Sequence, residues 1–405
     1  MIEECIILAD SPSALIQLCG ISVLERLLRT LQICEVKNAI ILSSTPDSIE
    51  QHLRRPSRSR ANVKCTIHAR SSGPVTGNQV ADVWPARVEY ALVLHGDTVF
   101  DARLLPILAA QSASTALVDL AIPAPLQGLV DSAPAVFHGK FCGASLLHRS
   151  SVSGQSAPLE DVIRNGMERR DIAGLDAGAQ PLYSGTMRRE LRPFWFPAPS
   201  PGNKRAAERI LLDSAQKGTL DFPAWVHAPI ENFLISKLCN TCITPNQLTL
   251  FCNIVAWTTT VLFATGRLAP GIILALIVGV LDGLDGKQAR IKVEISKGGK
   301  LEHWFDGLFE ISWWTALAYH FRSSGELPEA FWYLLLLLFA EGLDAIAKAT
   351  PGSGGWIGDR GRPSPWVPAA RGGHGLGDPD SVPVPRARQE WEVRGAGYRG
   401  PMLGG

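Results

Sequence analysis

The sequence predicts an α/β domain with a doubly wound, mostly parallel sheet, followed by an all-α transmembrane bundle and a disordered C-terminal tail. Three observations support this order: short β-rich runs alternate with helical patterns in the first half, residues 246–347 are strongly apolar, and residues 351–405 are rich in Gly, Pro and Arg. Four parts are expected: a cytoplasmic domain at 1–185, a connector with a juxtamembrane helix at 186–245, the membrane domain at 246–350 and the tail at 351–405.

The composition excludes one broad class of function. The chain has 405 residues, of which 46% are hydrophobic and 19% charged, and its net charge is +1. A nucleic-acid-binding protein would normally carry a strongly basic face, so no nucleic-acid partner is expected. The first residues, Met1–Cys5, lack the basic region and apolar core of a secretory signal, and the first domain is therefore expected in the cytoplasm.

The expected sheet depends on four β-rich runs in the first domain. They are Cys5–Ala9, Ala39–Leu42, Val63–His68 and Tyr90–Leu94. Between the first two, apolar residues recur at helical spacing from Ile21 to Leu31, and such alternation favours a mostly parallel sheet covered on both faces. Since ligands bind at the C-terminal ends of such strands, Asp97, just after the last run, is suitably placed for a metal or a sugar. The alternative is that Asp97 only caps a turn.

This half of the chain resembles sugar-phosphate nucleotidyltransferases, which are doubly wound enzymes that join a nucleotide to a sugar or alcohol phosphate. The resemblance rests on the strand order, on Val93–Asp97 and on the helix around Leu24–Leu31. That family begins with a Gly-rich loop carrying Arg and then Lys, which holds the triphosphate. The equivalent stretch here, Leu8–Leu15, contains no Gly, Arg or Lys. An active nucleotidyltransferase and a degenerate domain kept for binding or regulation therefore both remain open.

The connector and the apolar region indicate a membrane protein. Phe222–Cys239 has few charges, which is typical of a helix on the cytoplasmic membrane surface but also of a soluble helix packed on the first domain. About four membrane spans are expected, at Leu248–Ala264, Gly271–Leu281, Phe305–Phe321 and Ala330–Leu343. Basic residues cluster in the polar stretch 282–300, which we expect to be a loop facing the cytoplasm. The chain is thus expected in the cytoplasmic (inner) membrane.

Four carboxylates in this polar stretch and just after it are the strongest functional signal. Asp282 and Asp285 are three residues apart at the expected end of one helix, and Glu302 and Asp306 are four apart at the start of the next. If the two helices pair, the carboxylates converge, and divalent cations such as Mg²⁺ or Mn²⁺ would offset their repulsion. Ionisable residues at the edge of a bilayer indicate function, although solvated carboxylates at ordinary helix ends are the alternative.

The same stretch resembles the signature of the CDP-alcohol phosphatidyltransferases, D-x-x-D-G-x-x-A-R, then eight or so residues, then G-x-x-x-D-x-x-x-D. The first part is matched by Asp282, Asp285, Gly286, Ala289 and Arg290. The second part is matched by Gly298, Glu302 and Asp306, with Glu in place of the third aspartate and a spacer one residue short. Taking Gly299 as the glycine restores the spacer but puts His303 at the third carboxylate position.

This resemblance implies metal-dependent transfer of a phospho-alcohol group from a CDP-alcohol to an acceptor hydroxyl, with release of CMP, in phospholipid or polar phosphodiester biosynthesis. It implies metal ligands at Asp282, Asp285, Glu302 and Asp306, a general base at Asp306, and a cytidine-diphosphate site at Gly286, Ala289 and Arg290. The implied partners are the CDP-alcohol donor, an alcohol or alcohol-phosphate acceptor and the lipid bilayer, and a homodimer is left open.

Two further hypotheses come from other classes. The chain could be a bifunctional cytidylyltransferase and phosphotransferase, or a non-catalytic membrane remnant with a regulatory cytoplasmic domain. The family usually has six spans, whereas after Thr350 the composition no longer supports a buried core, which predicts disorder. That abrupt change suggests a frameshifted or truncated gene product.

Overall fold

The computed structural model describes most of the first 349 residues. The described ranges are 3–55, 62–86, 88–136, 139–185, 187–218, 222–241, 243–294 and 299–349. Within them, the side chains at 222–226, 299–306, 344–345 and 347–349 are outside the description. The expected disorder of residues 351–405 also falls outside the described residues.

The first domain is built on one mixed sheet with the strand order β11-β8-β10-β6-β1-β4-β5. Its strands are β1 (Glu4–Leu8), β4 (Asn38–Ser43), β5 (Lys64–Ala69), β6 (Tyr90–His95), β8 (Thr115–Asp119), β10 (Gly139–His148) and β11 (Ala173–Asp176), and β9 (Ala135–Val136) pairs with β10. Strands β6, β1, β4 and β5 run parallel, whereas β10 is antiparallel to both β6 and β8. The predicted α/β class and all four predicted strands are confirmed.

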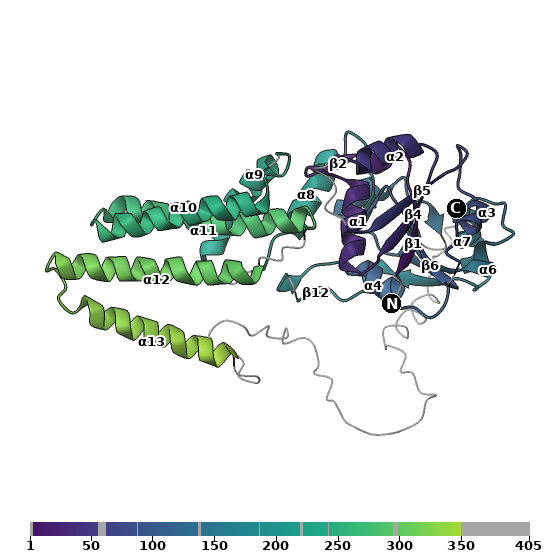
Figure 1. The fold of residues 1–405 in the computed structure, drawn as a ribbon. Helices are drawn as coiled ribbons and strands as arrows, with labels where there is room; N and C mark the ends of the chain where they lie inside the picture. Colours follow the sequence, from purple (N-terminus) through teal and green to yellow (C-terminus); the bar gives the residue numbers. More distant parts are fainter. Residues whose placement is uncertain are drawn as a thin grey trace, which may run out of the picture. The chain divides into compact units, whose positions relative to one another are not determined.

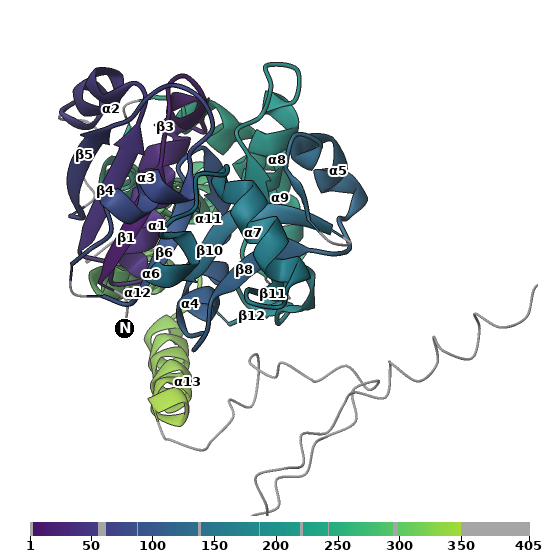
Figure 2. The same ribbon diagram turned by 90° about the vertical axis from the view of Figure 1, so that its right-hand side faces the viewer.

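Helices cover both faces of this sheet, as Figures 1 and 2 show. They are α1 (Val23–Ile33), α2 (Pro46–Leu53), α3 (Gly77–Asp82), α4 (Leu104–Ala109), α5 (Ala124–Val130), α6 (Arg149–Val152), α7 (Leu159–Glu168) and α8 (Lys204–Ser214). Short 3₁₀ turns lie at Ser13–Leu15 and Ala177–Ala179. Small two-stranded pairs join β2 (Gln17–Leu18) to β3 (Ile21–Ser22), β7 (Thr98–Phe100) to β14 (Trp195–Pro197), and β12 (Tyr183–Ser184) to β13 (Arg189–Glu190).

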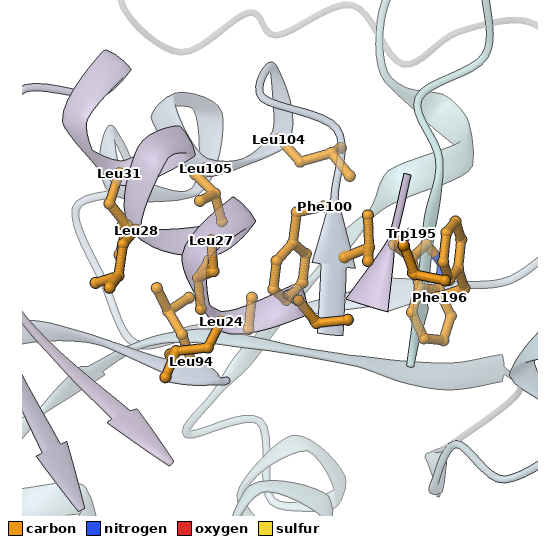
Figure 3. Packing of buried hydrophobic residues seen from close by; sticks show 14 of the residues in the cluster. Leu24, Leu27, Leu28, Leu31, Leu94, Phe100, Leu104, Leu105, Trp195 and Phe196 are labelled. Carbon is orange, nitrogen blue, oxygen red and sulfur yellow. The ribbon is translucent and has the colours of Figure 1, made fainter. Parts of the chain in front are cut away.

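The two faces of the sheet form two separate hydrophobic clusters. Because successive strand residues point to opposite faces, Ile7 of β1 belongs to the cluster under α1 and α4, while Ile6 belongs to the one under α3, α6 and α7. Figure 3 shows the first cluster, in which Leu24, Leu27 and Leu28 of α1 pack over the sheet. Helix α1 begins where Ser22 Oγ accepts a hydrogen bond from the backbone N–H of Glu25.

Five helices follow the α/β domain. They are α9 (Phe222–Leu238), α10 (Pro245–Ala264), α11 (Leu268–Ile291), α12 (Gly299–Ser323) and α13 (Ala330–Ala349). Helix α10 begins with a capping box between Thr244 and Gln247, and it packs against α11 and α12 (Figure 1). Helix α9 packs against α11, and α13 packs against α12.

The surface of these helices suits an apolar medium. Among the described residues, α10 and α11 are long and apolar enough to cross a membrane, and Ala330–Leu343 of α13 is a shorter apolar segment. Large apolar side chains such as Leu250, Leu276 and Leu336 are more than half exposed. Each of the four predicted spans lies within a helix, and their number as membrane spans stays a prediction.

One predicted boundary is wrong. The stretch 282–300 was expected as a loop after an apolar helix ending at Leu281, but α11 continues to Ile291. Leu284, Gln288 and Ile291 are buried there, so packing with neighbouring segments keeps the polar stretch helical. Asp282 and Asp285 therefore lie about two to three turns before the end of the helix rather than at its end.

Candidate functional site

The two aspartates of α11 have different surroundings. Asp285 is buried, and its Oδ2 accepts a hydrogen bond of 2.6 Å from Thr249 Oγ1 of α10. Asp282, three residues earlier, is exposed. The hydroxyl of Thr249 therefore fixes the carboxylate of Asp285 within the α10–α11 pair, whereas the carboxylate of Asp282 is open to solvent.

The donor chemistry of these two residues suits a hard divalent cation. Carboxylate oxygens are the ligands that Mg²⁺ and Mn²⁺ prefer, and a hydroxyl that orients a carboxylate is a common supporting contact around metals. Among the described side chains, no three acidic, His or Cys residues gather into a metal site. The side chains of Glu302 and Asp306 lie outside the described residues, so the convergence of four carboxylates stays a prediction.

One face of α11 consists of residues spaced by four and approaches α9 closely. A Cβ at Gly279 would lie 3.0 Å from Cε1 of His227, and a Cβ at Gly283 would lie 2.4 Å from Oε1 of Glu231. One turn further along the same face, the fully buried Lys287 replaces glycine. Small residues four apart thus leave room on α11 for the side chains of His227 and Glu231.

Lys287 is the centre of a polar cluster that the sequence analysis missed. Its Nζ donates to Oε1 of Gln216 and to Oδ1 of Asn232, and it lies 4.0 Å from Oε2 of Glu231. These partners belong to the connector, in α9 and just after α8. The spacing of Gly279, Gly283 and Lys287 was a visible signal for a helix contact, but nothing in the sequence identified the partner.

Gly286, Ala289 and Arg290 are brought together near the carboxyl end of α11. A Cβ at Gly286 would lie 3.2 Å from Nη1 of Arg290, so the glycine leaves room for this guanidinium to lie along the helix. Nε of Arg290 donates 2.9 Å to the carbonyl oxygen of Ala215, at the end of α8. Ala289 and Arg290 also line a cavity of about 530 Å³ together with Arg26 of α1.

Positive charge gathers around the exposed end of this site. The pKa of Lys217 is lowered by partial burial and by the nearby cations Arg188 and Arg290, while Asp282 opposes the shift. Lys217 and Arg188 belong to the segments that precede α9. The connector thus supplies cations beside the α11 motif, where they would attract an anionic donor.

A second cavity, of about 340 Å³, lies in the α/β domain at the C-terminal ends of its parallel strands. Asp97, in the turn after β6, lines it together with His95, Glu160 and Arg70. Asp10 lies in the stretch that replaces the Gly-rich loop. Its carboxylate accepts hydrogen bonds from the backbone N–H (2.7 Å) and Oγ (2.8 Å) of Ser44, and it pairs with Arg70. A carboxylate held by Ser44 and Arg70 therefore lies in the stretch where the sequence analysis looked for a Gly-rich loop.

The comparison with protein families concerns the helical part of the chain. Residues 242–350 match the model of the CDP-alcohol phosphatidyltransferase family. The resemblance first found in the motif around Asp282–Arg290 is thereby confirmed.

Two curated relatives share the name bifunctional IPC transferase and DIPP synthase. The one from Thermococcus kodakarensis is 28% identical over 160 residues, which are 38% of this chain and 35% of the relative. The one from Aquifex aeolicus is 31% identical over 146 residues, which are 34% of this chain and 33% of the relative. This chain thus matches about a third of the length of these relatives.

Solved structures with some likeness to the chain include the inositol-1-phosphate CTP transferase from T. maritima, with a TM-score of 0.39 and 12% identity over 52% of this chain and 96% of that one. HddC from Yersinia pseudotuberculosis has a TM-score of 0.37 and 14% identity over 52% of this chain and 100% of that one.

Proposed function

We propose that this chain, whose residues 242–350 form a CDP-alcohol phosphatidyltransferase domain, moves a phospho-alcohol group from a CDP-alcohol to an acceptor hydroxyl and releases CMP. The observation that carries the proposal is the complete D-x-x-D-G-x-x-A-R motif on one continuous helix, with Asp285 oriented by Thr249. The motif lies next to cations of the connector, which suits a doubly anionic pyrophosphate donor.

In this proposal Asp282, Asp285, Glu302 and Asp306 would hold Mg²⁺ or Mn²⁺, which would neutralise charge on the pyrophosphate and on the leaving CMP. Thr249 keeps one carboxylate oxygen of Asp285 in place, which lowers the cost of ordering the ligand set. Arg290 and the backbone at Gly286 would contact the cytidine-diphosphate part of the donor, since a guanidinium binds phosphate oxygens in a fork.

Asp306 would act as general base. It would take the proton of the acceptor hydroxyl while the hydroxyl oxygen forms a bond to the phosphorus that carries the alcohol, and the bond from that phosphorus to the CMP oxygen breaks. The acceptor is an alcohol or an alcohol phosphate, and the product is a phosphodiester of the phospholipid or polar type. The apolar surfaces of α10 and α11 support a bilayer location, proposed as the inner membrane with the α/β domain in the cytoplasm.

The test is CMP release by the full chain in purified membranes, with a panel of CDP-alcohols and acceptors and with Mg²⁺, Mn²⁺ or a chelator. We expect release only with a divalent cation. Thr249→Val should reduce the rate about tenfold, whereas Thr249→Ser, which keeps the hydroxyl, should retain most of it. Metal-independent release, or release unchanged by Asp306→Asn, would contradict the proposal.

A second candidate is a bifunctional chain whose α/β domain makes the CDP-alcohol. It is favoured by the two-activity names of both curated relatives and by the cavity that Asp97 lines at the strand ends. The stretch Leu8–Leu15 argues against it, because it has no Gly, Arg or Lys to hold a triphosphate and its Asp10 is already paired with Arg70. CTP-dependent release of pyrophosphate by the full chain, lost in Asp97→Asn, would establish this second activity.

A further inference from the structure

The carboxyl end of α11 has an unusual geometry. Val293 lies just past the helix with a φ of 52°, in the left-handed region that disfavours β-branched residues. The backbone N–H of Val293 donates 3.2 Å to the carbonyl oxygen of Arg290, and that of Glu294 donates 2.8 Å to Ala289. This is the Schellman ending, which normally has glycine at the left-handed position. Other contacts must therefore help to hold this terminus.

Two arginines of α1 supply such contacts from the α/β domain. Nη1 of Arg26 donates to the carbonyl oxygen of Ile291, and Nη1 of Arg29 donates 2.7 Å to that of Lys292. Arg29 also pairs with Glu25 on its own helix and lies 3.4 Å from Oε1 of Glu294. The last carbonyl groups of a helix lack internal partners and carry its negative end, so both cations are well placed.

The burial of these arginines indicates that they are present for their contacts with the end of α11 rather than for packing. Arg26 and Arg29 are each only 4% exposed, on a helix whose other buried residues are mostly apolar. Among the described residues, the Nε atom of neither arginine has a hydrogen-bond partner. Burying a guanidinium with an unsatisfied N–H is unfavourable, and an apolar side chain would pack α1 at lower cost. The two arginines are thus explained by the carbonyl groups that they contact.

We propose that Arg26 and Arg29 are positioning residues for the membrane site: together they clamp the last turn of α11 and so set the place of Ala289 and Arg290. The effect on donor binding rests on the proposed function, whereas the clamp itself is a structural feature. Arg26, Ala289 and Arg290 border the same cavity of about 530 Å³. The α/β domain therefore acts on the transfer reaction without needing a nucleotide site of its own.

The test compares Arg26→Gln, Arg29→Gln and the double variant in the full chain in lipid nanodiscs. Arg54→Gln is the matched control, because Arg54 is an exposed arginine just after α2 of the same domain and its ion pair is to Glu50, four residues away. Hydrogen exchange should become about tenfold faster at the backbone amides of residues 288–294 in the double variant and stay unchanged at β1 and β6. The control should exchange like the wild-type chain at both places.

Kinetics provide the second measurement. A loosened last turn should raise the KM for the CDP-alcohol about tenfold and leave the KM for the acceptor unchanged, because Ala289 and Arg290 belong to the donor half of the motif. Arg26→Lys, which keeps the charge and one donor, should recover part of the loss. A merely structural role would instead lower the active fraction and leave both KM values unchanged, and this result would overturn the proposal.

The two measurements separate this inference from the proposed function. If the wild-type chain releases no CMP under any condition, the proposed function is wrong, and the exchange at 288–294 alone decides the clamp. If exchange at 288–294 in the double variant equals that in Arg54→Gln, the clamp is wrong, whatever the activity of the wild-type chain.

Discussion

The α/β domain and the membrane helices use their aspartates differently. At the end of β1, Asp10 is tied to the backbone and hydroxyl of Ser44 and to the guanidinium of Arg70. On α11, Asp285 accepts hydrogen bonds from Thr249 and from the backbone N–H of Gly286, and Asp282 is exposed. The contacts of Asp10 hold a loop of its own domain in place. Those of Asp285 orient a carboxylate beside an exposed one.

The two regions also differ in how they bury their apolar side chains. The sheet of the α/β domain is covered on both faces by hydrophobic clusters, and its central strand residues are fully buried. Helices α10 and α11 instead keep large aliphatic side chains exposed, with 28% and 22% of their most apolar segments buried. The cluster under α1 continues into the helical part through Ile235, Leu248 and Leu284, whereas the cluster on the other face lies within the α/β domain. The helical part needs a bilayer or further helices to cover its apolar side chains.

The largest expected effect separates the two candidate sites. Asp285→Asn should reduce CMP release from a supplied CDP-alcohol by about a hundredfold or more, because the carboxylate proposed to bind the metal loses its charge. Asp97→Asn, which changes the cavity of the α/β domain, should leave this rate unchanged. The measurement is CMP formation by full-length protein in membranes, with the amount of folded protein equalised.

Equal losses of CMP release in Asp285→Asn and Asp97→Asn would mean that the α/β cavity takes part in the transfer. An unchanged rate in Asp285→Asn would remove the membrane site from the reaction altogether.

The second prediction concerns the approach of α9 to α11. Gly283→Leu should destabilise the helical part by about 1–3 kcal/mol, because the leucine side chain would displace the buried carboxylate of Glu231. Gly342→Leu is the matched control: Gly342 also lies in a helix, and its added Cβ would meet nothing within 4 Å. Thermal unfolding in detergent, followed by the fluorescence of the tryptophans, measures the difference. Equal midpoints for the two variants would mean that α9 does not pack here.

The sequence alone predicted the parts of the fold that depend on local pattern. Short β-rich runs were enough for β1, β4, β5 and β6, and the helical spacing of Leu24, Leu27 and Leu31 was enough for α1, because these patterns are local in the sequence. The end of α11 could not be predicted in this way. Polar residues from Asp282 onward broke the apolar pattern, and the helix is continued by long-range partners such as Asn232 for Lys287.

In the candidate site, too, the local pattern could be predicted and the long-range contacts could not. The motif Asp282–Arg290 was recognisable because its residue types and spacing are fixed along one helix. Thr249 and the arginines of α1 were missed, since each contacts α11 from a distant part of the sequence. The role of Lys287 was missed because its partners Gln216 and Asn232 are equally distant. Spacing along a chain carries no information about which remote segment will cover a helix.

The third prediction tests the structural role of Asp10. Asp10→Ala should destabilise the α/β domain by about 1–3 kcal/mol, because the backbone N–H of Ser44 loses its acceptor and Arg70 loses its carboxylate partner, keeping only the carbonyl oxygens of Ser71 and Gly73. Glu50→Ala removes an exposed carboxylate whose ion pair with Arg54 should contribute at most about 0.5 kcal/mol. Hydrogen exchange at β4 and β5 measures the stability of the α/β domain in both variants. If Asp10→Ala were as stable as Glu50→Ala and gained CTP binding, the role of Asp10 would be to keep CTP out of the cavity rather than to stabilise the loop.

The smallest expected effect comes from the terminus of α11, where the two regions meet. Val293 adopts a left-handed backbone conformation that costs a residue with a Cβ about 1–2 kcal/mol. Val293→Gly removes this cost but gains chain entropy in the unfolded state, so a net stabilisation of about 0.5–1 kcal/mol is expected. Val293→Ala keeps the Cβ and is the matched control, with less gain. The measurement is hydrogen exchange at residues 288–294, which should slow in Val293→Gly.

The same substitution examines how the last turn of α11 is held. In the Arg29→Gln background, Val293→Gly should restore part of the lost protection at 288–294, because a relaxed Schellman ending depends less on outside contacts. If protection stayed as low as in Arg29→Gln alone, backbone strain at Val293 would not contribute to the looseness of this turn. The α/β domain would then hold α11 through the arginine contacts alone.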